Sequence, residues 1–361
     1  MSKNYRIPFP IIDFMPPVYA CRYNPKPFVL DGNINKDFWK EIPFTDEFQD
    51  IEGPTLPTPR FSTRAKIAWD DRNVYFAAVL EGDEIWSHVT EHDDVIFRDN
   101  DFEIFIDPDS DTQQYYEFEM NARNVYWDLL LTKAYRDNGK PTNAFDIKGI
   151  KTAVMIDGRL NDPSAENVRW SVEVVMPFTT LIECTPKNQL PAVGDYWRLN
   201  FSRVQWKVDV KDNEFVKRTN PETGAPLPED NWVWAPTGVI NIHYPEMWGF
   251  LFFADENGNV DCSIPEDEKR RWQLRQVYYC QRHYLEDNKH YASDLADLAD
   301  YLTECRKTCG SSEFTVPMTM EATKHTFVVR CRNAADTGDL YVLSDGKGGC
   351  ILDDARDDTY L

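Results

Sequence analysis

Short stretches in which hydrophobic and polar residues alternate follow one another between residues 29 and 253. The sequences FEIFID at residues 102–107 and YYEFEMN at residues 115–121 are the clearest of them. Since successive side chains of a strand point to opposite faces of a sheet, this period of two predicts strands with one apolar face and one face of carboxylates and aromatic rings. Further strands are predicted at residues 29–34, 66–69, 74–80, 125–131, 168–176, 196–206 and 249–253.

Helical periodicity is nearly absent from these residues, and turn-forming residues separate the short strands. This pattern predicts a mainly β fold, an antiparallel two-sheet β-sandwich of jelly-roll-like form. We expect the sandwich to span residues 27–254, after an irregular lead-in at residues 1–26. The segment from Lys207 to Trp234 is rich in proline, asparagine and charge, and a loop of this length is typically functional or mobile.

The pattern changes after Ala254. The sequence SIPE at residues 263–266 has the form of a capping box, with proline where its missing N–H does no harm. A helix is predicted from there to about Leu285, and a second over residues 293–305, because leucines recur at helical spacing. Residues 262–361 therefore form a small α+β extension, which is a candidate surface for a protein partner. Its strands are predicted at residues 326–331, 340–343 and 350–352.

The charge and the aromatic content point toward a class of ligand. A net charge of −22 would repel a phosphate backbone and an anionic membrane surface, so neither nucleic acid nor a membrane is an expected partner. A neutral oligo- or polysaccharide, or a cation such as calcium, is not penalised. The chain contains 11 tryptophans, and surplus tryptophan often marks a surface that stacks on ligands.

The N-terminal sequence does not predict a signal peptide, and the cysteines do not predict a zinc site. No stretch approaches the ~18 apolar residues of a membrane span, and the first residues carry Lys3, Arg6 and several prolines. We therefore expect no signal peptide and a cytoplasmic location by default; a different native start would allow an extracytoplasmic one. Cys305 and Cys309 lack a second close pair or a nearby histidine that would complete a zinc site, so we expect free thiols.

A family resemblance emerges from several short motifs in order. These are VLDG at residues 29–32, FW at 38–39, AWDD at 68–71, DFEIFID at 101–107 and YYEFEMN at 115–121. With these motifs the chain resembles the family 9 carbohydrate-binding modules. The resemblance implies a sandwich that binds a plant-type polysaccharide such as glucan or xylan, often at chain ends, without transforming it. Such modules hold the sugar between two aromatic rings and often contain calcium.

The same resemblance assigns roles to individual residues. Glu103 matches a family carboxylate that binds sugar hydroxyls, and Phe97 stands where the family has one stacking tryptophan. Glu119 stands where a sugar-binding arginine is expected. The second tryptophan would fall near residues 242–243, where neither Trp nor Tyr occurs. The expected ligand-binding residues are Phe97, Glu103, Glu119 and Asn121 on the outer sheet face, closed by a loop with Asn241, His243 and Trp248.

Calcium is the one ion that the sequence suggests. Asp107, Asp109 and Asp111 alternate in a short loop, and carboxylate oxygens at such positions suit calcium. A plain acidic turn is the alternative. We expect sugar binding to require no other cofactor.

Two other functions fit parts of the same residues. Glu103, Glu117 and Glu119 could supply the carboxylate pair of a glycoside hydrolase, although nothing in the sequence places one of them in an apolar pocket that would raise its pKa. Haem is the second alternative, because relatives in the wider fold group carry haem between their sheets on a methionine and a histidine or lysine. Met120 and His243 are the candidates for that role.

Overall fold

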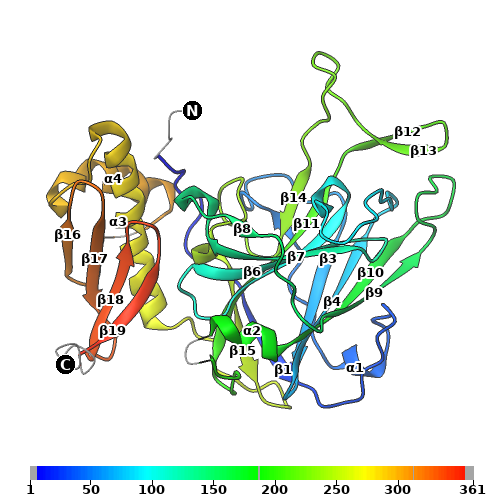
Figure 1. Cartoon of the computed structure of the whole chain (residues 1–361), viewed down its shortest axis with the longest axis horizontal. Helices are drawn as coiled ribbons and strands as arrows, with labels where there is room; N and C mark the ends of the chain where they lie inside the picture. Colours follow the sequence, from blue (N-terminus) through cyan, green and yellow to red (C-terminus); the bar gives the residue numbers. More distant parts are fainter. Residues whose placement is uncertain (1–5, 186–187, 312, 354–361) are drawn as a thin grey trace.

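The computed structural model describes residues 6–185, 188–311 and 313–353. Figure 1 shows a large curled sheet and, beside it, an extension of helices and strands that carries the C-terminal part of the chain. In the described part of the chain, no helix is long and apolar enough to cross a membrane.

Among the described residues, thirteen strands form the large sheet, in the order β8-β7-β6-β5-β11-β15-β1-β3-β4-β10-β9, with β14 attached to β11 and β2 attached to β14. Short helical turns connect them: α1 (Asp37–Lys40), η1 (Ile96–Arg98), η2 (Tyr135–Asp137), α2 (Phe178–Leu181), η3 (Ile182–Cys184) and η5 (Pro245–Met247). The strands are β1 (Val18–Tyr23), β2 (Gln49–Asp50), β3 (Thr63–Trp69), β4 (Asn73–Glu81), β5 (Asp101–Asp107), β6 (Gln113–Asn121), β7 (Tyr126–Lys133), β8 (Pro141–Thr142), β9 (Lys151–Asp157), β10 (Arg169–Pro177), β11 (Tyr196–Gln205), β14 (Asp230–Val233) and β15 (Gly249–Ala254).

The sheet curls so that its two halves face each other across one hydrophobic core. That core combines Phe76 and Val172 from one half with Phe118 and Phe201 from the other. The predicted mainly β sandwich is therefore confirmed, and its two layers are the halves of a single curled sheet.

The joint between the halves differs from the prediction. Residues 18–23, which lie in the expected irregular lead-in, form β1, and β1 pairs in parallel with both β15 and β3. The sheet is therefore not wholly antiparallel. Val18 pairs with Phe250, so the partner of β1 lies at the far end of the sandwich sequence, where no local pattern could reveal it.

The alternation of β5 and β6 is confirmed. Phe102, Ile104, Phe118 and Met120 lie in the core between the sheet halves. The intervening residues of both strands therefore point to the outer face of this half.

The outer face of the other half is covered by the segment that precedes β2. Phe38 and Trp39 of α1 are buried there against Tyr75. The buried carboxylate of Glu173 holds this segment, accepting hydrogen bonds from the Trp39 indole at 2.6 Å and from the backbone N–H of Gly32 at 2.8 Å. Residues 29–34 were predicted as a strand and turn; they form only a bend at Asp31 and Gly32, whose backbone N–H groups bond the Glu173 side chain in place of a strand partner.

The predicted loop from residue 207 to residue 234 contains regular structure. It forms the hairpin β12 (Val208–Lys211) and β13 (Glu214–Lys217), followed by β14. Figure 1 shows this hairpin projecting beyond the body of the sandwich.

The extension packs a helical layer on a separate sheet of four strands. The predicted first helix is confirmed as α3 (Glu266–Asn288), and the second is divided into η6 (Leu295–Leu298) and α4 (Ala299–Thr308). The sheet contains β16 (Met318–Ala322), which the sequence pattern missed, and β17 (Phe327–Arg332), β18 (Gly338–Leu343) and β19 (Gly348–Leu352). Its core also takes in Ile7 and Phe9 from the N-terminal segment and Tyr244 from the sandwich.

All eight cysteines are unbridged, in agreement with the expectation of free thiols. Cys305 and Cys309 lie on and directly after α4 with their sulfur atoms 3.9 Å apart.

Candidate functional site

A row of polar side chains crosses the outer face of the half that contains β5 and β6. Ser202 of β11 stands opposite Glu103 of β5, Glu103 stands opposite Glu119 of β6, and Glu119 stands opposite Trp127 of β7. The antiparallel register thus brings together two carboxylates that are distant in sequence. Oxygen atoms of Asp101, Glu103 and Glu119 lie within 4.8 Å of one another.

These carboxylates are buried, which changes their protonation. Burial raises the pKa of Glu103 to about 7 and that of Glu117 to about 8. Burial and the neighbouring Glu103 and Glu117 raise the pKa of Glu119 well above its usual range. Nothing in the sequence indicated these raised pKa values, because they result from side chains and loops that cover the strand after folding. Asp101 Oδ2 and Glu117 Oε2 are buried without a hydrogen-bond partner among the described residues.

Phe97 is the exposed member of the predicted set. It lies in η1 with 42% of its surface exposed. Its backbone N–H donates to the Glu119 carboxylate at 3.1 Å, and its carbonyl accepts a hydrogen bond from the Trp206 indole at 2.9 Å. The buried carboxylate row and two aromatic residues are therefore connected through η1.

An open pocket of about 510 Å³ adjoins these residues. Its walls come from the segment that leads to η1 and from β13 of the projecting hairpin. Asp99, which receives a hydrogen bond from the Asn121 side chain at 3.2 Å, lines it. Lys217 lines it from the hairpin side, with its ammonium group 3.2 Å from the centre of the Trp206 ring. The lining residues are Trp86, His88, Val89, Thr90, Glu91, Asp94, Arg98, Asp99, Glu214, Phe215, Val216 and Lys217.

The predicted closing loop packs on the outer face away from this pocket. Trp248 is fully buried, and its indole donates to the carbonyl of Ile242 at 2.8 Å. His243 Nδ1 lies 2.9 Å from the Tyr115 hydroxyl, and burial lowers the His243 pKa to about 3. Asn241 accepts a hydrogen bond from the His243 backbone at 2.9 Å. These three residues support the sheet face in this structure and contribute nothing to the pocket lining.

The haem alternative fails on geometry. Met120 lies in the core between the sheet halves, whereas His243 contacts Tyr115 on the outer face. Tyr115 and Met120 belong to the same strand and point to opposite faces of it. Met120 and His243 therefore cannot both coordinate one haem iron between the sheets.

The predicted calcium residues are brought together. Oxygen atoms of Asp107, Asp109 and Asp111 lie within 4.8 Å of one another, and Asp107 Oδ1 is buried without a partner among the described residues. Burial and Asp111 raise the pKa of Asp109 to about 6. Lys347 of the extension approaches Asp111 Oδ2 at 3.1 Å and would compete with an ion. The oxygen donors and the unpartnered oxygen fit calcium.

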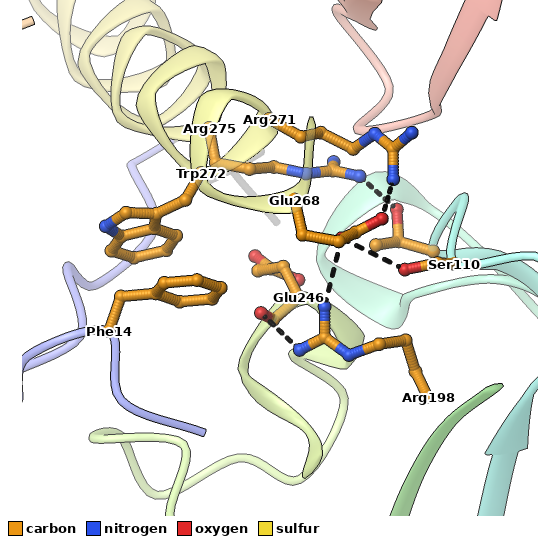
Figure 2. Close-up of a pocket in the computed structure, with 9 residues that line it drawn as sticks. Phe14, Ser110, Arg198, Glu246, Glu268, Arg271, Trp272 and Arg275 are labelled. Carbon is orange, nitrogen blue, oxygen red and sulfur yellow. Dashed lines mark hydrogen bonds and ion pairs between the residues drawn. The ribbon is translucent and has the colours of Figure 1, made fainter. Parts of the chain in front are cut away.

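A charged cluster joins the sandwich to the extension. Figure 2 shows Glu268 of α3 between Arg198 of β11 and Arg271 of its own helix, with Ser110 beside it. The cavity at this cluster has a volume of only about 10 Å³, the size of a single water site. The cluster is therefore an interface between the two parts of the chain, not a ligand site.

Some residues at the pocket were not selected from the sequence. Trp86 and Lys217 line the pocket, and Lys217 lies over the ring of Trp206, which bonds Phe97; only the folded chain brings these segments together. The hairpin sequence VDVKDNEFVK at residues 208–217 alternates around an Asp-Asn turn, and this signal could have predicted the hairpin. Nothing in the sequence alone could place it beside η1.

Comparisons with known proteins agree with the fold. Residues 30–194 match the model of the family described as carbohydrate family 9 binding domain-like. Two solved family 9 modules from Caldicellulosiruptor kristjanssonii are similar at 14% identity. The one in complex with cellotriose has a TM-score of 0.42 and covers 69% of this chain and 97% of its own. The one in complex with glucose has a TM-score of 0.40 and covers 66% and 98%.

A Bacteroides uniformis protein named for an inferred carbohydrate-binding role is also 14% identical, with a TM-score of 0.47, covering 66% of this chain and 99% of its own. No curated protein sequence matches the chain. The match of residues 30–194 to the family model, together with the curled sheet described above, assigns the fold. Residues 30–194 of the sandwich therefore have a carbohydrate family 9 binding domain-like fold.

Proposed function

We propose that the chain is a non-catalytic carbohydrate-binding protein that recognises a plant-type polysaccharide or its chain ends. The observation that carries this proposal is the match of residues 30–194 to the carbohydrate family 9 binding domain-like model. The negative charge of the chain agrees with a neutral glycan as ligand, because a neutral ligand is not repelled.

The sugar is proposed to occupy the open pocket beside η1. Its volume, about 510 Å³, lies in the range of sites that take small ligands. Phe97 of η1 has an exposed ring next in sequence to Arg98, which lines the pocket, and aromatic rings stack on the C–H faces of sugars. Asp94 and Arg98 line the pocket and can bond hydroxyl groups. Glu103, Glu119 and Asn121 lie behind this wall and support it.

The buried carboxylates do not by themselves argue for hydrolysis. Two glycosidase carboxyl groups stand about 5 to 9.5 Å apart so that the sugar and its water fit between them. Oxygen atoms of Glu103 and Glu119 lie within 4.8 Å of each other, and Glu103 has only 6% of its surface exposed. We therefore propose a structural role for this pair.

Calorimetric titration of the full chain tests the proposal. Cellotriose and glucose are the first ligands, followed by xylo- and manno-oligosaccharides. We expect saturable binding that Phe97→Ala weakens by about tenfold, since one aromatic–ligand contact is worth roughly 1 kcal/mol or more. Leu190→Ala, a change at a comparably exposed apolar residue, is the matched control and should bind as the parent does. Release of reducing sugar during the titration, or the absence of binding to every glycan, would contradict the proposal.

We also propose a structural calcium ion at Asp107, Asp109 and Asp111. Calcium bound there would neutralise the carboxylates of the sandwich that lie next to Lys347 of the extension. We do not propose that sugar binding depends on this ion.

A further inference from the structure

A cluster of one histidine and three aspartates lies at the edge of β7, apart from the pocket described above. His92 and Asp93 belong to the segment between β4 and η1, Asp128 belongs to β7, and Asp146 belongs to the segment between β8 and β9. Donor atoms of His92, Asp93 and Asp128 lie within 4.8 Å of one another. Asp146 Oδ1 lies 3.6 Å from His92 Nε2.

The tautomer of His92 is fixed by its surroundings. Its Nδ1 lies 2.8 Å from the backbone carbonyl of Tyr126, and a carbonyl can only accept, so Nδ1 carries the proton. The Nε2 atom faces the Asp146 carboxylate and can offer its lone pair to a metal ion that displaces the Nε2 proton. A histidine that donates from one nitrogen to a backbone carbonyl and presents the other is the usual arrangement of a metal ligand.

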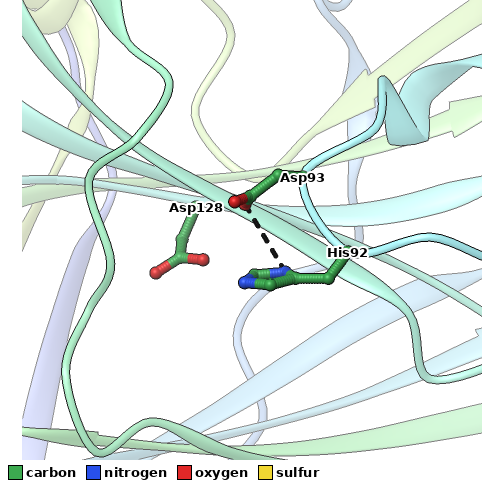
Figure 3. Close-up of side chains that lie close together, drawn as sticks. All are labelled: His92, Asp93 and Asp128. Atoms are coloured by element: carbon green, nitrogen blue, oxygen red, sulfur yellow. Dashed lines mark ion pairs between the residues drawn. The ribbon is translucent and has the colours of Figure 1, made fainter.

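Asp128 is the buried residue of this cluster, and it indicates a ligand site independently of the exposed His92 and Asp93. Its side chain has 1% of its surface exposed. One oxygen accepts a hydrogen bond from the backbone of Ile147, while Oδ1 is buried without a partner among the described residues. Figure 3 shows this carboxylate directed toward the end of the His92 ring, with Asp93 on another side of the ring. A buried carboxylate oxygen normally accepts a hydrogen bond, so Asp128 Oδ1 is a free electron-pair donor aimed at the His92 ring.

We propose that His92, Asp93, Asp128 and Asp146 form a binding site for a divalent transition-metal ion such as zinc. One imidazole nitrogen with carboxylate oxygens suits zinc, whereas calcium and magnesium prefer oxygen ligands alone. Three carboxylates converge on one imidazole here. A bound cation would offset the repulsion among these groups.

The ion would add a further connection among three segments that already share hydrogen bonds. His92 precedes η1 by a few residues, so the site would fix the start of the segment that carries Phe97 and lines the pocket. Its role is therefore structural, and it does not depend on whether the pocket binds sugar.

Zinc binding by the full chain tests the proposal directly. The protein is stripped with EDTA, dialysed, and titrated with zinc by calorimetry in excess calcium, which occupies oxygen-only sites. His92→Ala and the surface change Asp146→Asn are compared with His325→Ala, which removes an exposed histidine in the extension. We expect His92→Ala to weaken zinc binding by about tenfold or more, Asp146→Asn to weaken it less, and His325→Ala to leave it unchanged.

Two further readouts separate a metal site from a general change in the protein. Cobalt(II) should give a visible absorption band in the parent that His92→Ala lacks. Zinc should raise the melting temperature of the parent and not that of His92→Ala. Zinc binding that is the same in His92→Ala and the parent, or no zinc binding by the parent, would overturn the proposal.

Discussion

The carboxylate of Glu119 accepts a hydrogen bond from the backbone N–H of Phe97 at 3.1 Å. Glu119 has 2% of its surface exposed, while Phe97 has 42%. A buried acid on β6 thus anchors an exposed aromatic ring in η1. Glu119 was predicted to bind sugar directly; its position in the structure supports a role in holding η1 beside the pocket.

Glu119→Ala should therefore weaken sugar binding through η1. The change removes a hydrogen bond to a carboxyl group whose raised pKa favours its neutral form. Such a bond contributes about 0.5 to 1.5 kcal/mol, and its loss should appear as lower order in η1. We expect cellotriose affinity to fall by about fivefold to tenfold, while Glu119→Gln, whose amide oxygen can still accept the bond, stays close to the parent. Calorimetry of the three proteins measures this. Equal affinities for Glu119→Ala and the parent would rule out the anchoring role.

The raised pKa of Glu117 predicts a pH-dependent stability. A carboxyl group whose pKa rises from 4.5 to about 8 on folding favours folding fully below its unfolded pKa, and this contribution is lost as pH rises through the folded pKa. Glu117→Gln stays neutral and should not lose it. The free energy of unfolding of the parent should therefore fall, relative to Glu117→Gln, between about pH 4.5 and about pH 8. One pKa unit corresponds to about 1.4 kcal/mol.

Urea unfolding at several pH values measures that difference. Glu166→Gln, a change at an exposed glutamate, is the control and should follow the parent at each pH. A parent and Glu117→Gln with parallel pH profiles would show that Glu117 does not titrate as its burial requires.

The alternation of apolar and polar residues was sufficient to predict which side chains of β5 and β6 face the core. The inward positions of Ile104 and Phe118 followed from a period of two, because burial of one sheet face imposes it. β1 could not be predicted in this way, since its partners Phe250 and Ala68 come from distant strands. The covering segment held by Glu173 also depends on a contact across more than 100 residues of sequence.

The candidate site was less predictable than the fold. Phe97 and Glu103 were selected because they match positions of the family 9 modules, and they lie in η1 and β5. Trp248 is aromatic and close to the expected second stacking position, yet it is fully buried. Nothing local distinguishes a tryptophan that packs against the sheet from one that faces a ligand. Likewise, Trp206 reaches Phe97 only through the folded sheet.

The clamp around Glu173 predicts a large loss of stability on truncation. Its fully buried carboxylate accepts bonds from Trp39 and Gly32 and forms an ion pair with Lys36 at 2.8 Å. Glu173→Ala leaves the Trp39 and Gly32 donors unpaired and removes the buried partner of Lys36, which keeps Asp31; breaking a buried ion pair costs about 3 to 5 kcal/mol. Urea unfolding should show a loss of that size. Glu183→Ala, a change at a less buried glutamate, is the control, and a loss in Glu173→Ala no larger than in this control would contradict the clamp.

The proposed calcium site predicts opposite effects for two substitutions. Asp109→Asn removes a ligand charge, so calcium affinity should fall by about tenfold. Lys347→Met removes the cation that lies 3.1 Å from Asp111 Oδ2, so affinity should rise. Calcium at a hundredfold excess over its Kd would stabilise the parent by about 2.7 kcal/mol, which a thermal shift detects. Asp46→Asn, at an exposed aspartate, is the control. The same calcium shift in Asp109→Asn and Lys347→Met would contradict the site.

The contact between the sandwich and the extension predicts strong coupling between Arg198 and Glu268. Their charged atoms lie 3.4 Å apart, and each side chain has 3% of its surface exposed. Burial alone would raise the pKa of Glu268, but Arg271 and Arg198 hold it below its usual value. Glu268→Leu leaves Arg198 buried without this partner, which should cost about 3 to 5 kcal/mol, while the double variant with Arg198→Met should cost less than the sum of the single changes.

A double-mutant cycle by urea unfolding measures this coupling, with Lys269→Met as a control at an exposed position of α3. Limited proteolysis adds a second readout, because separation of the two parts would expose the connection between β15 and α3 at residues 255–265. We expect faster cleavage there in Glu268→Leu than in Lys269→Met. Additive stability changes and unchanged cleavage would mean that the apolar core around Tyr244 and Tyr279, and not the ion pair, holds the extension to the sandwich.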